Sequence, residues 1–195
     1  MFNNINVFDN FLEDPDYISY LARQQKYYSI DGYPEFENDP RDFYFPGFRT
    51  LCMDKFNKPL MRFLNDRIIN RVLDMGLDLR RVRSYTYNPP NVSAFFAFQT
   101  KDDVFEESWF HSDYCLYAAV LYLQKKPAKN SGTILRLPHK DMIIDNVYNR
   151  LIFYRADILH SVQGTFGTNI YDARLTYCSF IGDVDISIKH NNLVK

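Results

Sequence analysis

The second half of this 195-residue chain is divided into short apolar segments rich in aromatic and β-branched residues, and this division constrains the fold most. Pro, Gly and Asn clusters separate the segments, a pattern typical of β-strands. No long helical pattern comes between them, which argues against a parallel α/β sheet and favours a sandwich, jelly roll or barrel. The predicted strands are residues 82–87, 93–99, 115–123, 133–137, 150–154 and 174–181.

The first half predicts two helices that cover the sheet. One begins after Asp14, a suitable N-cap followed by Pro15 at the first helical position, and continues to about residue 25. The second spans about residues 59–75, where apolar residues recur every three or four positions, and Gly76 is a suitable C-cap. Residues 27–50 between them are irregular and rich in aromatic residues, and loops of this length more often have a function than none.

The charge balance argues against one class of partner, duplex nucleic acid. The chain has 23 Lys and Arg against 24 Asp and Glu, and this net charge of −1 predicts no surface for duplex nucleic acid. The longest apolar run, residues 115–123, is too short to cross a bilayer, and no signal-peptide pattern is visible at the N-terminus. We therefore expect no membrane partner.

The three cysteines have no CxxC spacing and are odd in number, which favours a reducing, cytoplasmic setting over a disulfide framework. Cys115 and Cys178 lie in apolar strands and are interpreted as inert core residues. The simplest organisation is a single domain over residues 1–195. Its expected parts are a helical cover with the aromatic loop (1–80), a β core (81–182) and a tail (183–195).

Two histidines and an aspartate form the candidate metal site. His111 and Asp113 are two residues apart, so on a strand both point to the same face. His160 follows the apolar segment 150–154 and would be the third ligand if the two segments are neighbours. Two imidazoles and one carboxylate are the facial triad of non-haem Fe(II) oxygenases. An H-x-D pattern alone is weak, because a solvated turn or a structural histidine explains it equally well.

Arg174 opens the last predicted strand and shares a face with Thr176. A buried arginine in a β core needs an anionic partner, and its planar fork suits a carboxylate. The alternative is a structural ion pair with an aspartate. The remaining histidines, His139 and His190, lie in polar surroundings and are not expected to be ligands.

Read in order, residues 108–181 resemble the Fe(II)/2-oxoglutarate-dependent dioxygenases, and most closely their prolyl-hydroxylase branch. The resemblance is carried by His111-Ser112-Asp113, the segments 118–124, 131–138 and 149–154, His160-Ser161-Val162 and the strand from Arg174. The segments 7–12 and 44–49 are similar to those of small bacterial and phage oxygenases. The resemblance implies a double-stranded β-helix (jelly roll, cupin-like), mainly β with flanking helices of α+β type, with N-terminal helices packed on the major sheet.

The resemblance also implies roles for individual residues. One Fe(II) would be held by His111, Asp113 and His160, with 2-oxoglutarate and O2 as cosubstrates and ascorbate as an optional reductant. Arg174 would pair with the distal carboxylate of 2-oxoglutarate, and Tyr122 would donate a hydrogen bond to the same group. Thr176 would assist them, and Leu135 would pack on the methylenes of the cosubstrate.

The expected function is hydroxylation of a peptidyl or free amino-acid C–H, with conversion of 2-oxoglutarate to succinate. The aromatic segment 27–50 and the segment 161–173 are expected to wall the open side of the iron. A nucleobase is the second candidate substrate. Two other classes stay open: a zinc hydrolase with the same three ligands, and a β-helix binding module without turnover.

Overall fold

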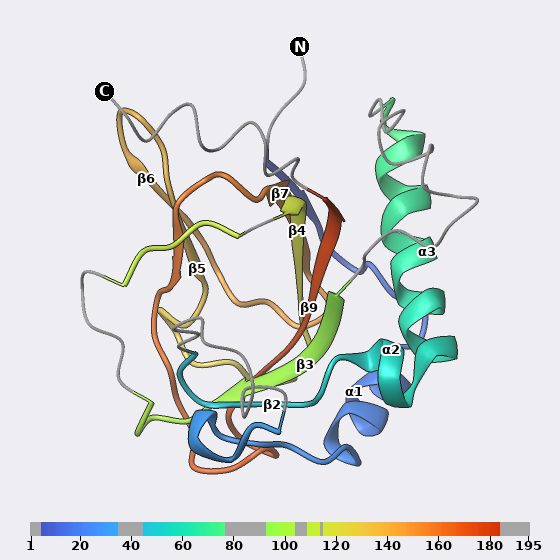
Figure 1. Cartoon of the computed structure of the whole chain (residues 1–195). Helices are drawn as coiled ribbons and strands as arrows, with labels where there is room; N and C mark the ends of the chain where they lie inside the picture. Colours follow the sequence, from blue (N-terminus) through green and yellow to red (C-terminus); the bar gives the residue numbers. More distant parts are fainter. Residues whose placement is uncertain (1–4, 35–44, 77–92, 104–108, 114, 184–195) are drawn as a thin grey trace.

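The computed structural model describes residues 5–34, 45–76, 93–103, 109–113 and 115–183, and two antiparallel sheets form the centre of this part (Figure 1). The larger sheet has the strand order β1 (Ile5–Phe8), β7 (Leu151–Arg155), β4 (Cys115–Tyr122), β9 (Arg174–Asp183), β3 (Ser93–Gln99), β2 (Phe48–Arg49). The smaller sheet has the order β6 (Asp141–Ile144), β5 (Thr133–Arg136), β8 (His160–Val162). The predicted β core with flanking helices is therefore confirmed.

The two predicted helices are present within two residues of their expected ends. In α1 (Pro15–Arg23), the Asp14 side chain accepts a hydrogen bond from the backbone N–H of Tyr17 at 3.0 Å. In α3 (Lys58–Asp74), Asn57 is the N-cap, and Gly76 follows the helix at a φ of +76°. The short helices α2 (Met53–Phe56) and η1 (Ile30–Gly32) were not predicted. Among the described residues, no helix is long and apolar enough to cross a membrane.

Five predicted strands are confirmed as β3, β4, β5, β7 and β9, with ends that differ by at most two residues. The sixth, 82–87, lies outside the described residues. Four observed strands were not predicted: β1, β2, β6 and β8, each of two to four residues. Strands this short carry little alternation of their own, and pairing with longer neighbours defines them.

The two faces of the larger sheet have different coverings. On one face, Phe96, Leu121 and Tyr177 pack with α3 residues Leu64 and Ile68 in the main apolar core. Figure 1 shows α1, α2 and α3 on this side and β5 and β6 on the other, which confirms that the N-terminal helices pack on the major sheet. On the second face, buried residues of both sheets form a smaller core: Tyr122, Leu135, Ile152 and Tyr154 are among them.

One polar contact joins α3 to the sheet. The side-chain oxygen of Asn65 accepts hydrogen bonds from Tyr177 Oη at 3.0 Å and from Ser179 Oγ at 2.7 Å. All three residues are buried, and the two hydroxyls and the Asn65 oxygen have partners in an otherwise apolar layer. This contact fixes where α3 sits along β9.

Candidate active site

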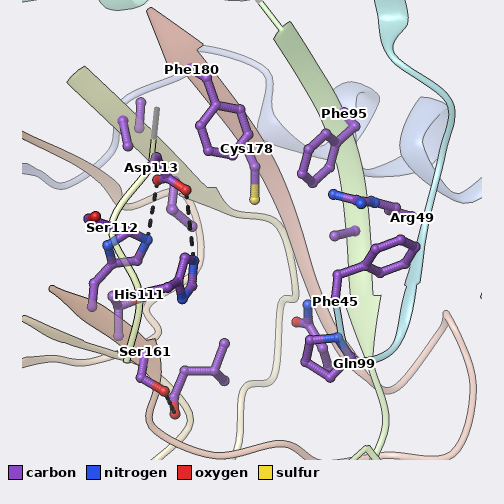
Figure 2. A pocket seen from close by; sticks show the side chains of 18 of the residues that line it. Phe45, Arg49, Phe95, Gln99, His111, Ser112, Asp113, Ser161, Cys178 and Phe180 are labelled. Carbon is purple, nitrogen blue, oxygen red and sulfur yellow. Dashed lines mark hydrogen bonds and ion pairs between the residues drawn. The ribbon is translucent and has the colours of Figure 1, made fainter. Parts of the chain in front are cut away.

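The three candidate metal ligands meet beside β8. The backbones of His111 and His160 exchange two hydrogen bonds of 3.1 and 2.9 Å, and Asp113 N–H donates to Ala156 O at 2.9 Å. Each of the three side chains offers one ligand atom, and these atoms lie within 4.8 Å of one another. Asp113 Oδ2 is 3.3 Å from His160 Nε2, and Asp113 Oδ1 is 3.8 Å from His111 Nε2 (Figure 2). The structure thus brings the predicted triad together.

The hydrogen bonds around His160 fit a metal between these side chains. His160 Nδ1 is 2.9 Å from Ile158 O, and because a carbonyl only accepts, Nδ1 carries the proton. In the neutral ring the Nε2 lone pair then faces the Asp113 carboxylate. Asp113 Oδ2 is buried, and no described residue donates a hydrogen bond to it. Two acceptors facing each other in a buried place are stabilised by a cation between them.

His111 is also suited to bind a metal. Burial, followed by the coulombic effect of His160, lowers the pKa of His111 to about 4, although Asp113 raises it. Its ring is therefore neutral at neutral pH, and no proton has to leave before the ring ligates a metal. The ring of Trp109 lies 4.4 Å from that of His111, and the Tyr154 ring packs edge-on against His160 at 5.0 Å. These contacts hold both imidazole rings in place.

The triad opens into a cavity of about 640 Å³ between the two sheets, a volume in the usual range for small-molecule sites of about 300–1,000 Å³. Its wall is largely apolar, and six of its residues are aromatic: Phe45, Phe48, Phe95, Trp109, Tyr154 and Phe180. The interpretation of Cys178 as a core residue is wrong, since the residue is half-buried and borders the cavity. Alternation along β9 places it on the face of Arg174. Cys115 is buried as predicted and also borders the cavity.

Arg174 borders the same cavity and is only 3% exposed. Its guanidinium donates to three neutral oxygens. These are Gln99 Oε1 at 2.8 Å, Ser131 O at 3.2 Å and Thr133 Oγ1 at 3.4 Å. In the described part of the chain no carboxylate pairs with it, so the alternative of a structural ion pair is not found there. A buried cation with neutral partners beside a cavity suits an anionic ligand.

Tyr122 supports this end of the cavity from behind. Its hydroxyl is 2.7 Å from Thr133 Oγ1, and Thr133, rather than Tyr122, borders the cavity. Burial raises the pKa of Tyr122 despite the nearby Arg174, so the phenol keeps its proton. The backbone at Gly132, directly before Thr133, lies very close to β6. A Cβ at position 132 would lie 1.9 Å from Ile144 O, so only glycine fits there.

The other two predicted site residues lie deeper. Thr176 is fully buried and donates to Ala97 O at 3.4 Å. Leu135 is also fully buried, opposite His160 in the β5–β8 ladder. Neither borders the cavity. His139 is exposed, as expected, and His190 lies outside the described residues.

Sequence reasoning missed several residues that border the cavity, Gln99, Trp109 and Thr133 among them. The Ser131-Gly132-Thr133 motif was a usable signal for Thr133, whereas only the β3–β9 register places Gln99 opposite Arg174. The two segments that were expected to wall the open side of the iron do so in part. The cavity is bordered by Phe45, Pro46, Phe48 and Arg49 of segment 27–50 and by Ser161 and Val162 of segment 161–173. Residues 35–44 lie outside the described part.

Comparison with known proteins identifies the fold. No family model matches the sequence, and no curated protein sequence matches it significantly. A solved Pseudomonas putida prolyl-4-hydroxylase is similar over 93% of each chain, with a TM-score of 0.57 and 13% identity. A Trichoplax adhaerens prolyl hydroxylase, in complex with a hypoxia inducible factor peptide fragment, has a TM-score of 0.59 and 12% identity over 99% of this chain and 88% of its own.

A third similar structure is HygX from Streptomyces hygroscopicus, solved with nickel and 2-oxoglutarate bound. It has a TM-score of 0.57 and 11% identity over 93% of this chain and 84% of its own. The likeness shows that the chain has the fold of 2-oxoglutarate/Fe(II) oxygenases, similar to its prolyl-hydroxylase branch. The predicted double-stranded β-helix is therefore confirmed.

Proposed function

We propose that this chain is an Fe(II)- and 2-oxoglutarate-dependent dioxygenase. One observation carries the proposal: a cluster of two histidines and one aspartate shares a cavity with a buried arginine whose partners among the described residues are neutral. The first feature suits Fe(II) and the second suits a carboxylate. This reaction needs both a metal site and a carboxylate site. The similar structures that are 2-oxoglutarate/Fe(II) oxygenases have the same fold.

The residues have distinct tasks. His111, Asp113 and His160 would hold the metal from one side, so that the cavity side stays open to ligands. Bound Fe(II) supplies the activation of O2 that couples decarboxylation of 2-oxoglutarate to C–H hydroxylation. In the balanced reaction one oxygen atom of O2 enters succinate, the other enters the substrate hydroxyl, and CO2 leaves.

The other end of the cavity would bind the distal carboxylate of 2-oxoglutarate. Arg174 supplies the charge and Thr133 a hydroxyl, while Tyr122 orients Thr133 from behind. Leu135 and Thr176 would act as buried supports of this wall. Because Gln99 and Ser131 hold the guanidinium in place, little side-chain entropy is lost when the carboxylate binds.

Two other classes fit less well. A zinc hydrolase could use the same three ligands, but hydrolysis does not require a buried guanidinium beside the metal site. A binding module without turnover would not need an Asp113 oxygen that faces an imidazole lone pair and receives no hydrogen bond from any described residue.

For the substrate we propose an amino-acid C–H, peptidyl or free, with a nucleobase as the second candidate. The support is the cavity itself: its volume fits a side chain, and its aromatic wall suits an apolar group better than a phosphate backbone. The net charge of −1 agrees with an amino-acid substrate, because a surface for duplex nucleic acid would carry an excess of positive charge.

Succinate formation tests the proposal. The protein is incubated with Fe(II), 2-oxoglutarate and O2, together with panels of amino acids, peptides or oligonucleotides. We expect succinate in wild type, stimulated by an amino-acid or peptide panel. Stimulation by oligonucleotides alone would select the nucleobase. Absence of any 2-oxoglutarate turnover and of 2-oxoglutarate binding would contradict the proposed activity.

A further inference from the structure

We propose that Gln99 determines the charge of the acid that this cavity accepts. Because the Gln99 side chain is a neutral amide, it holds the Arg174 guanidinium without neutralising it, so that the guanidinium can pair with a ligand carboxylate. The inference rests on the proposed function, and it makes Gln99 the residue that selects a dicarboxylic 2-oxo acid as cosubstrate. Gln99 is the last residue of β3 and lies directly opposite Arg174 of β9.

The contact between Gln99 and Arg174 has a defined orientation. The Gln99 side-chain oxygen is 2.8 Å from Arg174 Nη1, and both residues are buried. Because a guanidinium only donates, the Gln99 atom that faces it is the oxygen, and the amide NH2 group points away from Arg174. Gln99 borders the cavity, and Figure 2 shows it across the cavity from His111 and Asp113.

Hydrogen-bond donors outnumber acceptors around this contact. Of the five N–H groups of a guanidinium, three are used by Arg174 on Gln99, Ser131 and Thr133. The remaining two N–H groups, and the NH2 group of Gln99, donate to no described residue. A carboxylate has only acceptors, with about four lone-pair positions on its two oxygens. The donors at this end of the cavity therefore suit a carboxylate in number as well as in charge.

No acid of the described residues neutralises Arg174. Asp113 is the only acid among the described residues that border the cavity, and it faces the two histidines. Asp103, in the turn after β3, accepts two hydrogen bonds from Thr100 and does not border the cavity. A glutamate at position 99 would have the size of glutamine but would form an ion pair with Arg174. One amide group thus decides whether the protein or the ligand supplies the anion.

The backbone holds Gln99 in this place. Gly47, directly before β2, has a φ of +81°, a conformation that favours glycine. A Cβ at position 47 would lie 2.9 Å from Gln99 Cγ and 2.6 Å from Phe98 O. Glycine therefore allows this segment to pack directly on the stem of Gln99, which keeps the amide beside Arg174.

The test compares two keto acids of the same size by calorimetric titration into Zn(II)-loaded protein. One is 2-oxoglutarate, and the other is 5-methyl-2-oxohexanoate, in which an isopropyl group replaces the distal carboxylate. We expect wild type to bind 2-oxoglutarate about 30-fold or more tightly, as when one partner of a buried charge pair is removed. Equal binding of the two keto acids by wild type would overturn the inference.

Two variants separate charge from shape. Gln99→Glu keeps the shape, but we expect it to lose about 30-fold or more in 2-oxoglutarate affinity and to bind both keto acids about equally. Gln99→Met changes the shape but leaves Arg174 without an anion, so it should keep the preference, with 2-oxoglutarate affinity within about tenfold of wild type. Gln24→Glu, exposed at the end of α1, adds the same charge elsewhere and should bind like wild type. A purely structural role of Gln99 predicts the opposite order, with Gln99→Met the weaker binder.

Thermal melts give a second readout. Without ligand, Gln99→Glu should melt no lower than wild type, because the new carboxylate pairs with Arg174. Added 2-oxoglutarate should raise the melting temperature of wild type more than that of Gln99→Glu. If neither Gln99→Glu nor the shorter Gln99→Asp folds, an acid at this position does not pair with Arg174, and the inference is overturned.

The outcomes also distinguish this inference from the proposed function. Wild-type affinity for 2-oxoglutarate in Gln99→Glu, or a larger loss in Gln99→Met than in Gln99→Glu, would overturn the inference alone. Absence of 2-oxoglutarate binding to wild type would contradict the proposed function itself.

Discussion

The two faces of the larger sheet are formed by the same strands, but one packs against the helices and the other borders the cavity. On β9, Leu175 and Tyr177 point into the helix-covered core, whereas Arg174 and Cys178 border the cavity. The helix-covered face is apolar, and the Asn65 oxygen there accepts hydrogen bonds from Tyr177 and Ser179. The cavity face has a buried cation, Arg174, with neutral partners, and in the same cavity an oxygen of Asp113 to which no described residue donates a hydrogen bond. We therefore expect the helix-covered face to contribute most to stability and the cavity face to bind ligands.

The largest effect is expected at the triad. Asp113→Ala removes the only anionic ligand of the cluster, so turnover of 2-oxoglutarate should be lost. The fold should persist, because no described residue donates a hydrogen bond to the Asp113 Oδ2 atom that is lost. Succinate formation and a thermal melt measure the two outcomes. Asp157→Ala, an exposed aspartate paired with Arg155, is the matched control and should be fully active. Normal turnover by Asp113→Ala would refute the ligand assignment.

Neighbouring phenylalanines on β3 compare the two faces directly. Phe96 is fully buried under the helices, so Phe96→Ala should lower the free energy of unfolding by about 3–5 kcal/mol. Phe95 is half-buried and borders the cavity, so Phe95→Ala should cost less stability and change substrate binding instead. Urea denaturation and activity per folded molecule measure both. The division between faces fails if Phe95→Ala is the more destabilising substitution.

Arg174 tests the charge on the cavity face. Arg174→Ala leaves the distal carboxylate of 2-oxoglutarate without its cation, which should weaken cosubstrate binding by about 2–5 kcal/mol. Calorimetric titration of 2-oxoglutarate into the metal-loaded protein measures the loss. Affinity equal to that of wild type would show that Arg174 has only a structural role.

The smallest effect is expected at Tyr122. Tyr122→Phe keeps the ring and removes the hydroxyl that lies 2.7 Å from Thr133 Oγ1. One neutral hydrogen bond contributes about 0.5–1.5 kcal/mol, so 2-oxoglutarate affinity should fall by that amount. A loss as large as that of Arg174→Ala would mean that Tyr122 contacts the cosubstrate itself rather than through Thr133.

Local patterns in the sequence predicted most of the architecture. Helical spacing and the capping residues Asp14 and Gly76 located α1 and α3, and alternation located the five longer strands. The short strands β1, β2, β6 and β8 were missed, because their extended conformation depends on partners far away in the chain. For example, β1 pairs, within the described part of the chain, only with β7, which lies more than 140 residues later.

The residues of the candidate site also fall into two groups, those that a local sequence pattern marks and those that only strand register places. His111, Asp113 and Arg174 stand in recognisable local patterns, and the structure brings them to one cavity. Gln99 was not recognised as a site residue, because its place opposite Arg174 follows from the register of β3 and β9. Cys178 was misread, since an apolar strand pattern does not distinguish a packed core from the wall of a cavity.

The most direct test of the account is an anaerobic visible absorption spectrum of the protein with Fe(II) and 2-oxoglutarate. Chelation of the metal by a keto acid produces a charge-transfer band. We predict a band that needs both Fe(II) and 2-oxoglutarate in wild type and that is absent in Asp113→Ala. A wild-type spectrum that does not change when 2-oxoglutarate is added to the Fe(II)-loaded protein would contradict the central claim that triad and arginine serve one cosubstrate.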